Sequence, residues 1–450
     1  MYDVVVCGAG PAGTAAAVTA ARHGARVLLL ERYGFAGGMA TSALVNPIAG
    51  WEFVDPHSGV TGSLIGGFFR EVAERLRSVG AFGSTWSPGA FDEQYLKYLY
   101  DRMLREAGVD VMFHTWIAGV VKHGQRVEAL ETYSKEGRRL VLGKIFIDST
   151  GDGDVAALAG CDFSYGRPSD GLAQAMTTKF RMANVDKAEM LRHADTLHQA
   201  RALVEPYFQE ARSNGSFVFP HRDRVQFYDY PRPGVLHFNM TRINELSPLS
   251  VADLTEAEME GRRQAYAIAE WLVKSVPYFQ NAWLEKVACQ VGVRETRHIA
   301  GEYTVTHQDI AEGRKFPDGI MRSTYFIDIH SPKGAGFEHE QSKWQIKDSF
   351  RPPAGDYYEV PYRSILPLDA ENLLVACRAL SCTHEGAAAV RVMANMIALG
   401  EAAGIAGARA ALKCVSPHEL DGRSIRNAIG YMDDPPDYGE IWSPLRIEAS

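Results

Sequence analysis

The chain begins MYDVVVCGAGPAGT, residues 1–14, and this stretch decides the fold. A short apolar run from Val4 to Cys7 stands directly before a glycine-rich turn and the start of a helix, which is the pattern of a dinucleotide-binding βαβ unit. Gly8 permits the sharp turn out of the strand, Gly10 lets the main chain approach a pyrophosphate, and Gly13 lets the helix pack closely on the strand. The sequence therefore predicts a nucleotide cofactor site at its start.

The second strand of this unit supports the prediction because it ends at a carboxylate. The apolar run from Ala25 to Leu30 is followed by Glu31, eighteen positions after Gly13. An acidic side chain at this distance hydrogen-bonds a ribose hydroxyl and disfavours a 2′-phosphate. The glycine-rich stretch at 32–41 then predicts a loop that brings backbone close to the same ligand.

The composition excludes several other classes of protein. Of 450 residues, 46% are hydrophobic and 23% are charged, which allows two or three domains with sizeable cores. The net charge of -8, without clustered Lys and Arg, argues against a nucleic-acid or membrane partner. Since no apolar stretch of about 18 residues and no cleavable leader is found, we expect a cytoplasmic protein. The six cysteines lie in no CxxC or zinc pattern, so no metal is expected.

Two helices and a small antiparallel sheet are expected after the first βαβ unit. The helices cover residues 64–79 and 92–107, where apolar residues recur at helical spacing. Four short runs rich in β-branched and aromatic residues then predict an antiparallel meander. These runs are Val109–Phe113, Ile117–Lys122, Arg126–Tyr133 and Arg139–Leu142.

A second glycine-bearing turn follows another buried strand. Residues 144–154 read KIFIDSTGDGD, and a parallel sheet would place this turn beside the first. Further along, aromatic residues become more frequent, and strand-like segments alternate with a long helix near 256–276. The chain then returns with a buried strand at 372–378 and one small-residue helix at about 387–413.

We therefore predict an α/β fold in three segments. Residues 1–160 would form a Rossmann-like domain whose parallel sheet carries the antiparallel meander. Residues 161–359 would form an inserted α+β domain that faces the substrate. Residues 360–450 would complete the first domain and add a C-terminal helix.

Three landmarks together are more specific than the glycine turn alone. They are GAGPAG with Glu31 and GGMAT at 37–41, IDSTGDGD at 147–154, and NLLVACRALSCTHEGAAAVRVM at 372–393. Together they resemble the FAD-dependent oxidoreductases of the glutathione-reductase-like, two-dinucleotide-binding superfamily. The segments GVRETR at 292–297 and Asp-Ile-His at 328–330 are similar to a poorly characterised bacterial group within it. The resemblance covers nearly the whole chain and implies FAD as cofactor.

The resemblance also implies which residues contact FAD. The first turn would take the pyrophosphate, Glu31 the ribose, and the backbone near Ile117 the adenine edge. The loop after Glu31 and the second turn would run along the rest of the cofactor, and the helix beginning near Gly386 would point at the flavin. The residues expected at the cofactor are Gly8, Gly10, Pro11, Ala12, Gly13, Glu31, Arg32, Gly38, Met39, Ala40, Thr41, Ile117, Gly151, Asp152, Asp154, Arg378, Gly386 and Ala387.

Four residues are candidates for the chemistry beside the flavin. His384 precedes the flavin-facing helix and is the first candidate for a base, because an imidazole titrates near neutral pH. Arg294 and Arg297 would suit a carboxylate or a developing oxyanion. His330 is a further candidate. Each has a structural alternative: loop hydrogen bonding for His384, an ion pair for the arginines, and for His330 a hydrogen bond to Asp328, which shares its strand face.

The leading functional prediction is an oxidoreductase that uses FAD to remove a hydride from, or to desaturate, a small organic substrate. The aromatic residues of the insert suit an aromatic or sugar-like substrate. An NAD(P)H-dependent flavin monooxygenase is the first alternative, and a flavoprotein with a binding or RNA-modification role is the second. The absence of a second complete GxGxxG and of CxxC disfavours a pyridine-nucleotide disulfide reductase. The electron acceptor, the oligomeric state and covalent attachment of flavin stay open.

Overall fold

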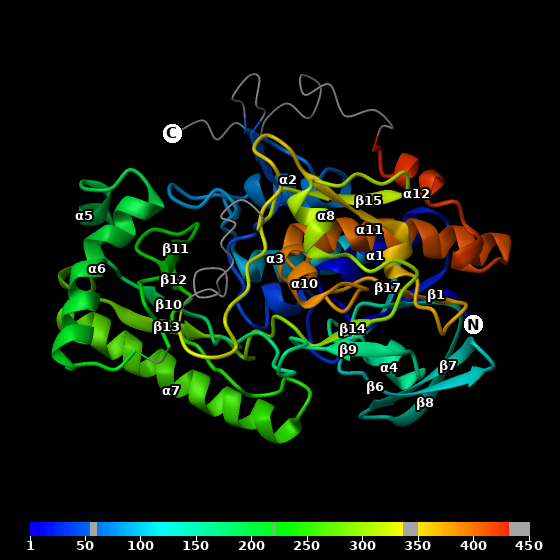
Figure 1. The fold of residues 1–450 in the computed structure, drawn as a ribbon, viewed down its shortest axis with the longest axis horizontal. Helices are drawn as coiled ribbons and strands as arrows, with labels where there is room; N and C mark the ends of the chain where they lie inside the picture. The colour runs from blue at the N-terminus through cyan, green and yellow to red at the C-terminus, as the bar shows by residue number, and fades with distance from the viewer. Residues whose placement is uncertain (55–60, 220, 336–349, 432–450) are drawn as a thin grey trace.

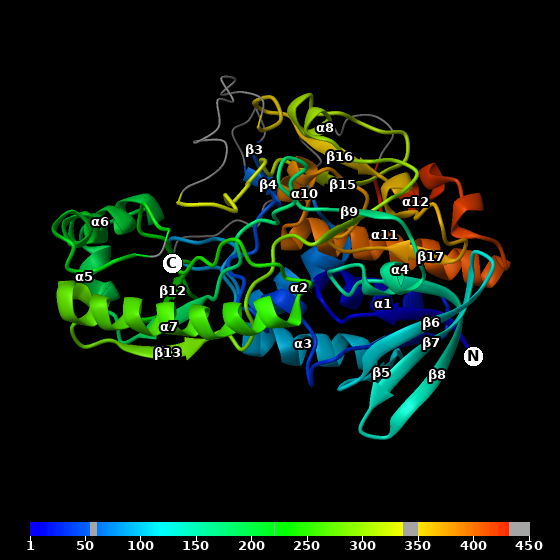
Figure 2. The ribbon, with the colours of Figure 1, turned by 60° about the horizontal axis from the view of Figure 1, so that its bottom comes forward.

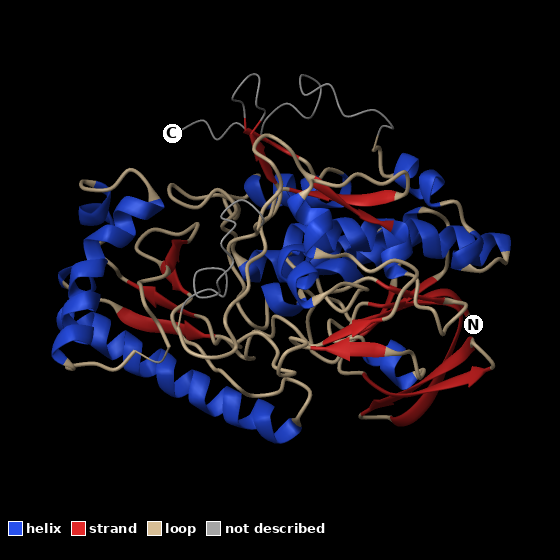
Figure 3. Cartoon of the chain, viewed as in Figure 1, coloured by secondary structure: helices blue, strands red, loops and turns tan. Residues whose placement is uncertain are grey.

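The computed structural model describes residues 1–54, 61–219, 221–335 and 350–431. Figure 1 shows two bodies side by side: a larger one that contains both the start and the end of the described chain, and a smaller one drawn mostly in green. We call them the main domain and the inserted domain. The arrangement agrees with the predicted mixed α/β fold, and the secondary structure of each body is seen in Figure 3.

The main domain is built on a mixed sheet whose central part is parallel. β5, β2, β1, β8 and β17 pair in parallel in that order, and β7 and β6 continue from β8 in antiparallel fashion. β1, β2 and β17 are short apolar runs, as a sheet covered on both faces requires. The strands are β1 (Tyr2–Cys7), β2 (Val27–Leu30), β5 (Asp110–Met112), β6 (Trp116–His123), β7 (Arg126–Ser134), β8 (Gly137–Asp148) and β17 (Leu373–Val375).

The meander differs from its prediction at both ends. The run at 109–113 was assigned to it, but this run forms β5 and pairs in parallel with β2. The run at 139–142 and the buried strand after it are one continuous strand, β8, which pairs with β7 through its first half and with β1 through its second. Gly143 lies where the two halves of β8 meet. Only glycine fits there, because a Cβ would lie 2.7 Å from the Val5 side chain. The glycine that suggested a break therefore permits close packing.

Helices cover one face of the parallel sheet, while the meander and the short helix α4 cover the other. Two of the helices pack against each other through small residues. α1 (Pro11–Arg22) lies along α11 (Met393–Lys413), as Figure 2 shows. A Cβ on Gly400 would lie 2.0 Å from the Ala12 carbonyl oxygen, so only glycine allows this approach. The other helices of the main domain are α2 (Gly67–Arg77), α3 (Glu93–Glu106), α4 (Asp154–Leu158), α8 (His307–Ala311), α10 (His384–Val390) and α12 (Gly422–Ala428).

The single helix predicted near 387–413 is wrong, because the chain bends there. α10 ends at Val390 and α11 begins at Met393, and their axes differ by 92°. Val392 is extended, with φ -68° and ψ 152°, and forms the N-cap of α11. No proline or glycine stands at this break, so the sequence predicts one continuous helix.

The inserted domain has its own sheet and its own core. The antiparallel strands lie in the order β11, β12, β10 and β13, and Phe180, Phe227 and Phe238 pack between them and the helices. The long helix predicted near 256–276 is α7 (Val251–Ser275). The remaining elements of this domain are β10 (Phe180–Ala183), α5 (Lys187–Leu191), α6 (Leu197–Asn214), β11 (Phe227–Asp229), β12 (Leu236–Phe238), η2 (Pro277–Phe279) and β13 (Trp283–Val287).

Part of the segment predicted as inserted packs with the main domain. Val305, Ile320 and Tyr358 belong to the same core cluster as α1 and α11. The apolar core of the inserted domain itself runs from Phe180 to Ala282, together with Trp86. The remaining short elements are η1 (Gly38–Ala40), β3 (Glu52–Val54), β4 (Thr61–Ser63), β9 (Phe163–Tyr165), β14 (Arg297–Ile299), β15 (Gly319–Ser323), β16 (Tyr358–Pro361), η3 (Tyr362–Ile365) and η4 (Pro417–Glu419).

Candidate active site

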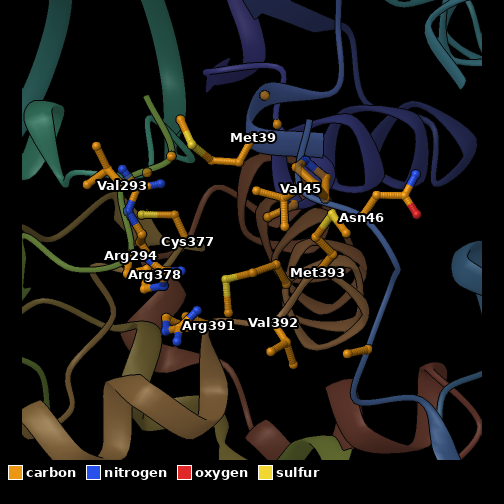
Figure 4. A pocket seen from close by; sticks show the side chains of 18 of the residues that line it. Met39, Val45, Asn46, Val293, Arg294, Cys377, Arg378, Arg391, Val392 and Met393 are labelled. Atoms are coloured by element: carbon orange, nitrogen blue, oxygen red, sulfur yellow. The ribbon is translucent and has the colours of Figure 1, made fainter. Parts of the chain in front are cut away.

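A cavity of about 410 Å³ joins the glycine turns of the main domain to the inserted domain. At one end it is lined by the turn between β1 and α1 and by the loops after β8 and β17. At the other end it is lined by polar and aromatic side chains, Lys179 and Tyr228 among them. Figure 4 shows Arg294, Arg378 and Arg391 to one side of the view. One continuous cavity therefore extends from the glycine turns to the inserted domain.

The first turn has the geometry that a phosphate group needs. Gly8 has φ +94°, and a Cβ on Gly13 would lie 1.8 Å from the Gly8 carbonyl oxygen, so both positions require glycine. A Cβ on Gly10 would meet only the Gly38 Cα, at 4.0 Å, which leaves its cavity side open. Gly10 is also the N-cap of α1, where no side chain caps the helix. The first N–H groups of α1 are therefore available to an anion.

Glu31 lines the cavity but is also part of its framework. Its two carboxylate oxygens accept hydrogen bonds from the backbone N–H of Ala9 at 2.7 Å and of Tyr33 at 2.9 Å. Burial raises the pKa of Glu31 above the usual carboxyl value, against these hydrogen bonds. The carboxylate thus ties the end of β2 to the glycine turn, and each oxygen retains a lone pair for a hydroxyl.

The second turn is organised by three acidic side chains. Buried Asp148, at the end of β8, accepts hydrogen bonds from the N–H of Thr150 at 3.0 Å and of Ala156 at 3.0 Å. Burial raises the pKa of Asp148 to about 6. Asp152 accepts a short hydrogen bond from Arg378, and Asp154 forms an ion pair with Arg297 at 2.9 Å. Gly151 and Arg378 line the cavity, whereas both aspartates that follow Gly151 hold arginines in place.

The helix N-terminus at the cavity belongs to α11 rather than to α10. Gly386 and Ala387, predicted to face the cofactor, do not line the cavity, and the Gly386 N–H donates to Thr383 Oγ1 at 3.2 Å. Val392 and Met393 do line it, and α11 has no side-chain cap. The 92° bend between α10 and α11 explains the difference. Because of it, the N-terminus of α11, and not that of α10, lies at the cavity.

We call the half of the cavity that Lys179, Tyr228, Arg294, Asp328 and Arg391 line the inserted half, because Lys179 and Tyr228 belong to the inserted domain. Several side chains of this half contact Asp328. Its Oδ2 accepts a hydrogen bond from the Tyr325 hydroxyl at 3.0 Å and lies 3.4 Å from His330 Nε2 and 3.5 Å from Arg391 Nη2. Its Oδ1 is buried and has no hydrogen-bond partner among the described residues. Although burial opposes ionisation, His330, Arg391 and Arg294 hold the pKa of Asp328 well below its usual range.

His330 lines the cavity and is bonded through both ring nitrogens. Nδ1 lies 3.1 Å from Arg242 Nη2, which can only donate, so Nδ1 accepts and Nε2 carries the proton toward Asp328. Burial, with the neighbouring Arg294, lowers the pKa of His330 well below its usual value. The alternative in which Asp328 and His330 contact each other is therefore confirmed.

Two cations line the same half without a carboxylate partner. Lys179 is 8% exposed, and its Nζ donates to the Asn46 carbonyl oxygen at 3.2 Å. Burial, together with the guanidinium groups of Arg294 and Arg222, lowers the pKa of Lys179 to about 7. Arg294 donates through Nη1 to Thr177 Oγ1 at 2.8 Å and to the Ala175 carbonyl oxygen.

His384, the first candidate for a base, lies outside the cavity lining. It is 2% exposed, and its Nδ1 lies 2.6 Å from Glu295 Oε1, an oxygen that His298 also contacts at 2.9 Å. His298 is in turn 3.4 Å from the Cys382 sulfur. Although burial opposes it, these partners raise the pKa of His298 to about 10, so Glu295 holds a charged imidazolium. The assignment of His384 as a base stays a prediction.

The cavity thus brings together part of the predicted set and adds residues that the sequence did not single out. The predicted residues that line it are Gly8, Gly10, Pro11, Ala12, Glu31, Arg32, Gly38, Met39, Gly151, Arg378, Arg294 and His330. Those that do not are Gly13, Ala40, Thr41, Ile117, Asp152, Asp154, Gly386, Ala387, His384 and Arg297. The residues that sequence reasoning missed include Lys179, Gln226, Tyr228, Asn239 and Tyr325. They come from separate segments with no fixed spacing, so no motif could have shown them.

Comparison with known proteins identifies the family. A family model described as FAD dependent oxidoreductase matches residues 3–429. The chain belongs to the FAD-dependent oxidoreductase family. FAD is its cofactor, and the chain is a flavoenzyme. The narrower glutathione-reductase-like superfamily stays a prediction.

Curated relatives of this FAD-dependent oxidoreductase match it only over short segments. One segment of 37 residues is 65% identical to a vinyl phenol reductase of Lactiplantibacillus plantarum and covers 8% of each chain. Another of 40 residues is 52% identical to a soluble pyridine nucleotide transhydrogenase of Chromohalobacter salexigens and covers 9% of each chain. The matches thus span less than a tenth of these relatives.

Similar solved structures share little sequence with the chain. A geranylgeranyl bacteriochlorophyll reductase-like protein from Thermoplasma acidophilum is 14% identical, with a TM-score of 0.45 over 95% of this chain and 83% of the other. A flavin-dependent brominase is 13% identical, with a TM-score of 0.45 over 95% and 84%. A p-nitrophenol 4-monooxygenase from Pseudomonas putida is 12% identical, with a TM-score of 0.37 over 67% and 69%.

The residues of the cavity fit FAD. The open side of Gly10, the uncapped start of α1 and the carboxylate of Glu31 suit a pyrophosphate and a ribose, as the FAD-binding pattern requires. The described part of the chain holds no group of three or more His, Cys, Asp or Glu side chains placed to bind a metal ion. Among the described residues no single helix is long and apolar enough to cross a membrane, although the bent pair α10 and α11 passes this criterion jointly.

Proposed function

We propose that this flavoenzyme oxidises a small organic substrate by hydride removal, with the substrate bound in the inserted half of the cavity. The observation that carries the proposal is the single cavity that joins the glycine turns to Asp328. Bound FAD supplies the hydride acceptor. Gly10, Glu31, Arg378 and the N-terminus of α11 would hold it at the other end.

Asp328 is the group we propose to orient the substrate. It lines the cavity, stays ionised, and has one carboxylate oxygen to which no described residue donates a hydrogen bond. That oxygen can accept a hydrogen bond from a substrate hydroxyl or amine. When hydride leaves the adjacent carbon, the O–H or N–H becomes strongly acidic, so even a weakly basic carboxylate can take the proton. Tyr325, His330 and Arg391 fix the other oxygen and thereby the plane of the carboxylate.

The test begins with the visible spectrum of the purified protein before and after acid precipitation. Flavin bands released to the supernatant mean non-covalent FAD, and bands kept in the pellet mean a covalent link. The holoenzyme is then mixed anaerobically with candidate alcohols, amines and saturated acids. The proposal expects bleaching of the flavin band near 450 nm, roughly the usual flavin maximum, without NAD(P)H.

The same experiment separates the alternatives. A monooxygenase is not reduced by substrate alone, but oxidises NADPH rapidly in air when an aromatic substrate is added. The line of Tyr228, Tyr325 and Phe326 along the cavity makes this the second candidate. A role in RNA modification would show as a gel shift with tRNA. Reduction by NADPH but by no organic donor would contradict the proposal.

A further inference from the structure

The inserted half of the cavity has more buried positive charge than its own carboxylate can balance. Lys179, Arg294 and Arg391 line it, from the segment before β10, the segment before β14 and the bend between α10 and α11. Asp328 is the acidic residue that lines this half, since Glu31 lies at the glycine-turn end. Three cations thus face one carboxylate.

The contacts of these cations leave the excess charge in place. Within the part of the chain that the structure describes, neither Lys179 nor Arg294 forms an ion pair with a carboxylate, and their hydrogen bonds go to carbonyl and hydroxyl oxygens. Arg391 donates through Nη2 to Asp328, while its Nε is buried without a hydrogen-bond partner. Arg222 and Arg242 lie nearby and add further positive charge. Burial, together with these two guanidinium groups and Arg391, lowers the pKa of Arg294. Burying a cation without an anionic partner costs free energy, so an anionic ligand would stabilise this site.

The shape and chemistry of the groups favour a carboxylate attached to a compact organic body. A planar guanidinium matches a carboxylate through paired N–H donors, and the ammonium of Lys179 adds a point charge. Tyr228, Tyr325 and Phe326 line the same half and offer flat apolar surface. Arg378 lies at the end where the cofactor phosphates are expected, so these three cations are not needed there.

We propose that the inserted half of the cavity binds the carboxylate of a small organic acid between Arg294, Arg391 and Lys179. This inference rests on the proposed function, because it defines the substrate class of the same site. The substrate is then an acid that carries an oxidisable C–H bond near a hydroxyl or amine, with that polar group at Asp328.

The test is binding to the oxidised holoenzyme, without turnover. Two pairs of probes differ in charge but hardly in shape: benzoate with benzamide, and propanoate with propanamide. Binding is followed by the change in the flavin absorption spectrum and by the shift in Tm. We expect at least one carboxylate to bind about tenfold or more tightly than its amide, since a charge-assisted hydrogen bond contributes that much.

Variants locate the binding. Arg294→Met and Arg391→Met should each weaken carboxylate binding about tenfold or more and leave amide binding unchanged, while Arg391→Lys should restore part of it. Arg263→Met on the exposed face of α7 is the matched control and should change nothing. If a Met variant fails to fold, two measurements still test the subsite: the difference in affinity between acid and amide for the wild type, and the same difference for Arg391→Lys.

The outcomes separate this inference from the proposed function. Carboxylate binding that depends on Arg294 or Arg391 supports the subsite even if no tested acid reduces the flavin. Equal binding of acid and amide, no binding of either pair, or a carboxylate preference that both Met variants retain would overturn it. In that case the cations balance the charge of the bound cofactor instead.

Discussion

Arg181 and Glu93 form a bidentate ion pair across the junction of the two domains. Arg181 on β10 donates through Nη1 and Nη2 to the two oxygens of Glu93 on α3, at 2.6 and 3.0 Å. Glu93 also accepts from the Tyr230 hydroxyl and from Lys286 Nζ, both at 2.8 Å. Although burial opposes it, Arg181 and Lys286 hold the pKa of Glu93 well below its usual range. This carboxylate therefore fixes the inserted domain on the helix that precedes the meander.

Replacement of Glu93 should strongly destabilise the protein. Glu93→Gln removes the carboxylate that pairs with buried Arg181 and with the partly exposed Lys286, and leaves Arg181 its ion pair with Glu285. We expect a loss of about 3 kcal/mol in the free energy of unfolding, at the lower end for a broken buried pair. Urea denaturation of the holoenzyme measures it. Arg192→Ala removes an exposed ion pair with Glu189 and should cost about 1 kcal/mol or less. Equal effects of the two variants would show that the pair at the junction is not structural.

Gly10 and Gly13 should respond differently to alanine. A Cβ at Gly10 projects into open space at the cavity, so Gly10→Ala should fold normally but bind FAD at least about tenfold more weakly. A Cβ at Gly13 collides with the Gly8 carbonyl oxygen, so Gly13→Ala should lower the Tm of the protein itself. Flavin release and Tm, measured on both variants, distinguish the two effects. Normal FAD affinity in Gly10→Ala would place the pyrophosphate elsewhere.

Asp328→Asn tests the proposed orienting group. The amide keeps the shape of the side chain but cannot take a proton, so we expect the rate of anaerobic flavin reduction to fall about 10²–10⁴-fold. The flavin content should be unchanged, because Asp328 is not among the residues proposed to hold FAD, and the amide keeps the shape of the side chain that Arg391 contacts. A variant with the wild-type rate would remove Asp328 from the chemistry.

His384→Gln separates the sequence-based candidate from Asp328. His384 lies 2.6 Å from Glu295 in a buried cluster, so its replacement should lower Tm through loss of that contact. If His384 is also the base, the variant loses far more turnover than the loss of folded protein explains. The value of kcat per folded protein distinguishes a structural role of His384 from a role as the base. Asp328→Asn is measured in parallel.

Glu401 should make stability depend on pH. Burial raises the pKa of Glu401 to about 7, above the value near 4.5 of an unfolded carboxyl, so the folded state holds a proton that the unfolded state releases between these values. Stability contributed by that proton is complete below about pH 4.5 and is lost as the pH rises through about 7. Glu401→Gln should therefore raise the free energy of unfolding by about 1–3 kcal/mol at about pH 8 and by little at about pH 5. Glu136→Gln, on the exposed end of the meander, is the control.

The glycine turns could be predicted because steric exclusion fixes them. Gly8 and Gly13 admit no other side chain, and that requirement is written at a constant spacing after an apolar strand. The bend between α10 and α11 could not be predicted, since Arg391 and Val392 carry no proline or glycine and the break depends on tertiary packing. In the same way Gly143 appeared to interrupt a strand, although it permits close contact with Val5.

The substrate half of the cavity was predicted only in part, for a related reason. Asp328 and His330 were found because residues two apart on an extended segment share a face. Arg294 was predicted from its place in GVRETR, as a side chain that suits a carboxylate. Lys179 and Arg391 stand on two other, distant segments, and only the folded chain brings them to the same wall. A periodic pattern in the sequence reflects local geometry. Contacts between residues far apart in the chain follow no fixed spacing, so the sequence pattern cannot predict them.

The packing of α1 against α11 affects how the chain is made. α1 is translated before the helix that covers it and before β17, which pairs with β8, because the meander and the inserted domain lie between them in the chain. The inserted domain has a complete core between Phe180 and Ala282 and can fold in the meantime. During synthesis, the face of α1 that packs on α11 therefore stays uncovered until α11 is made, and the cofactor site is completed only after the inserted domain has been translated.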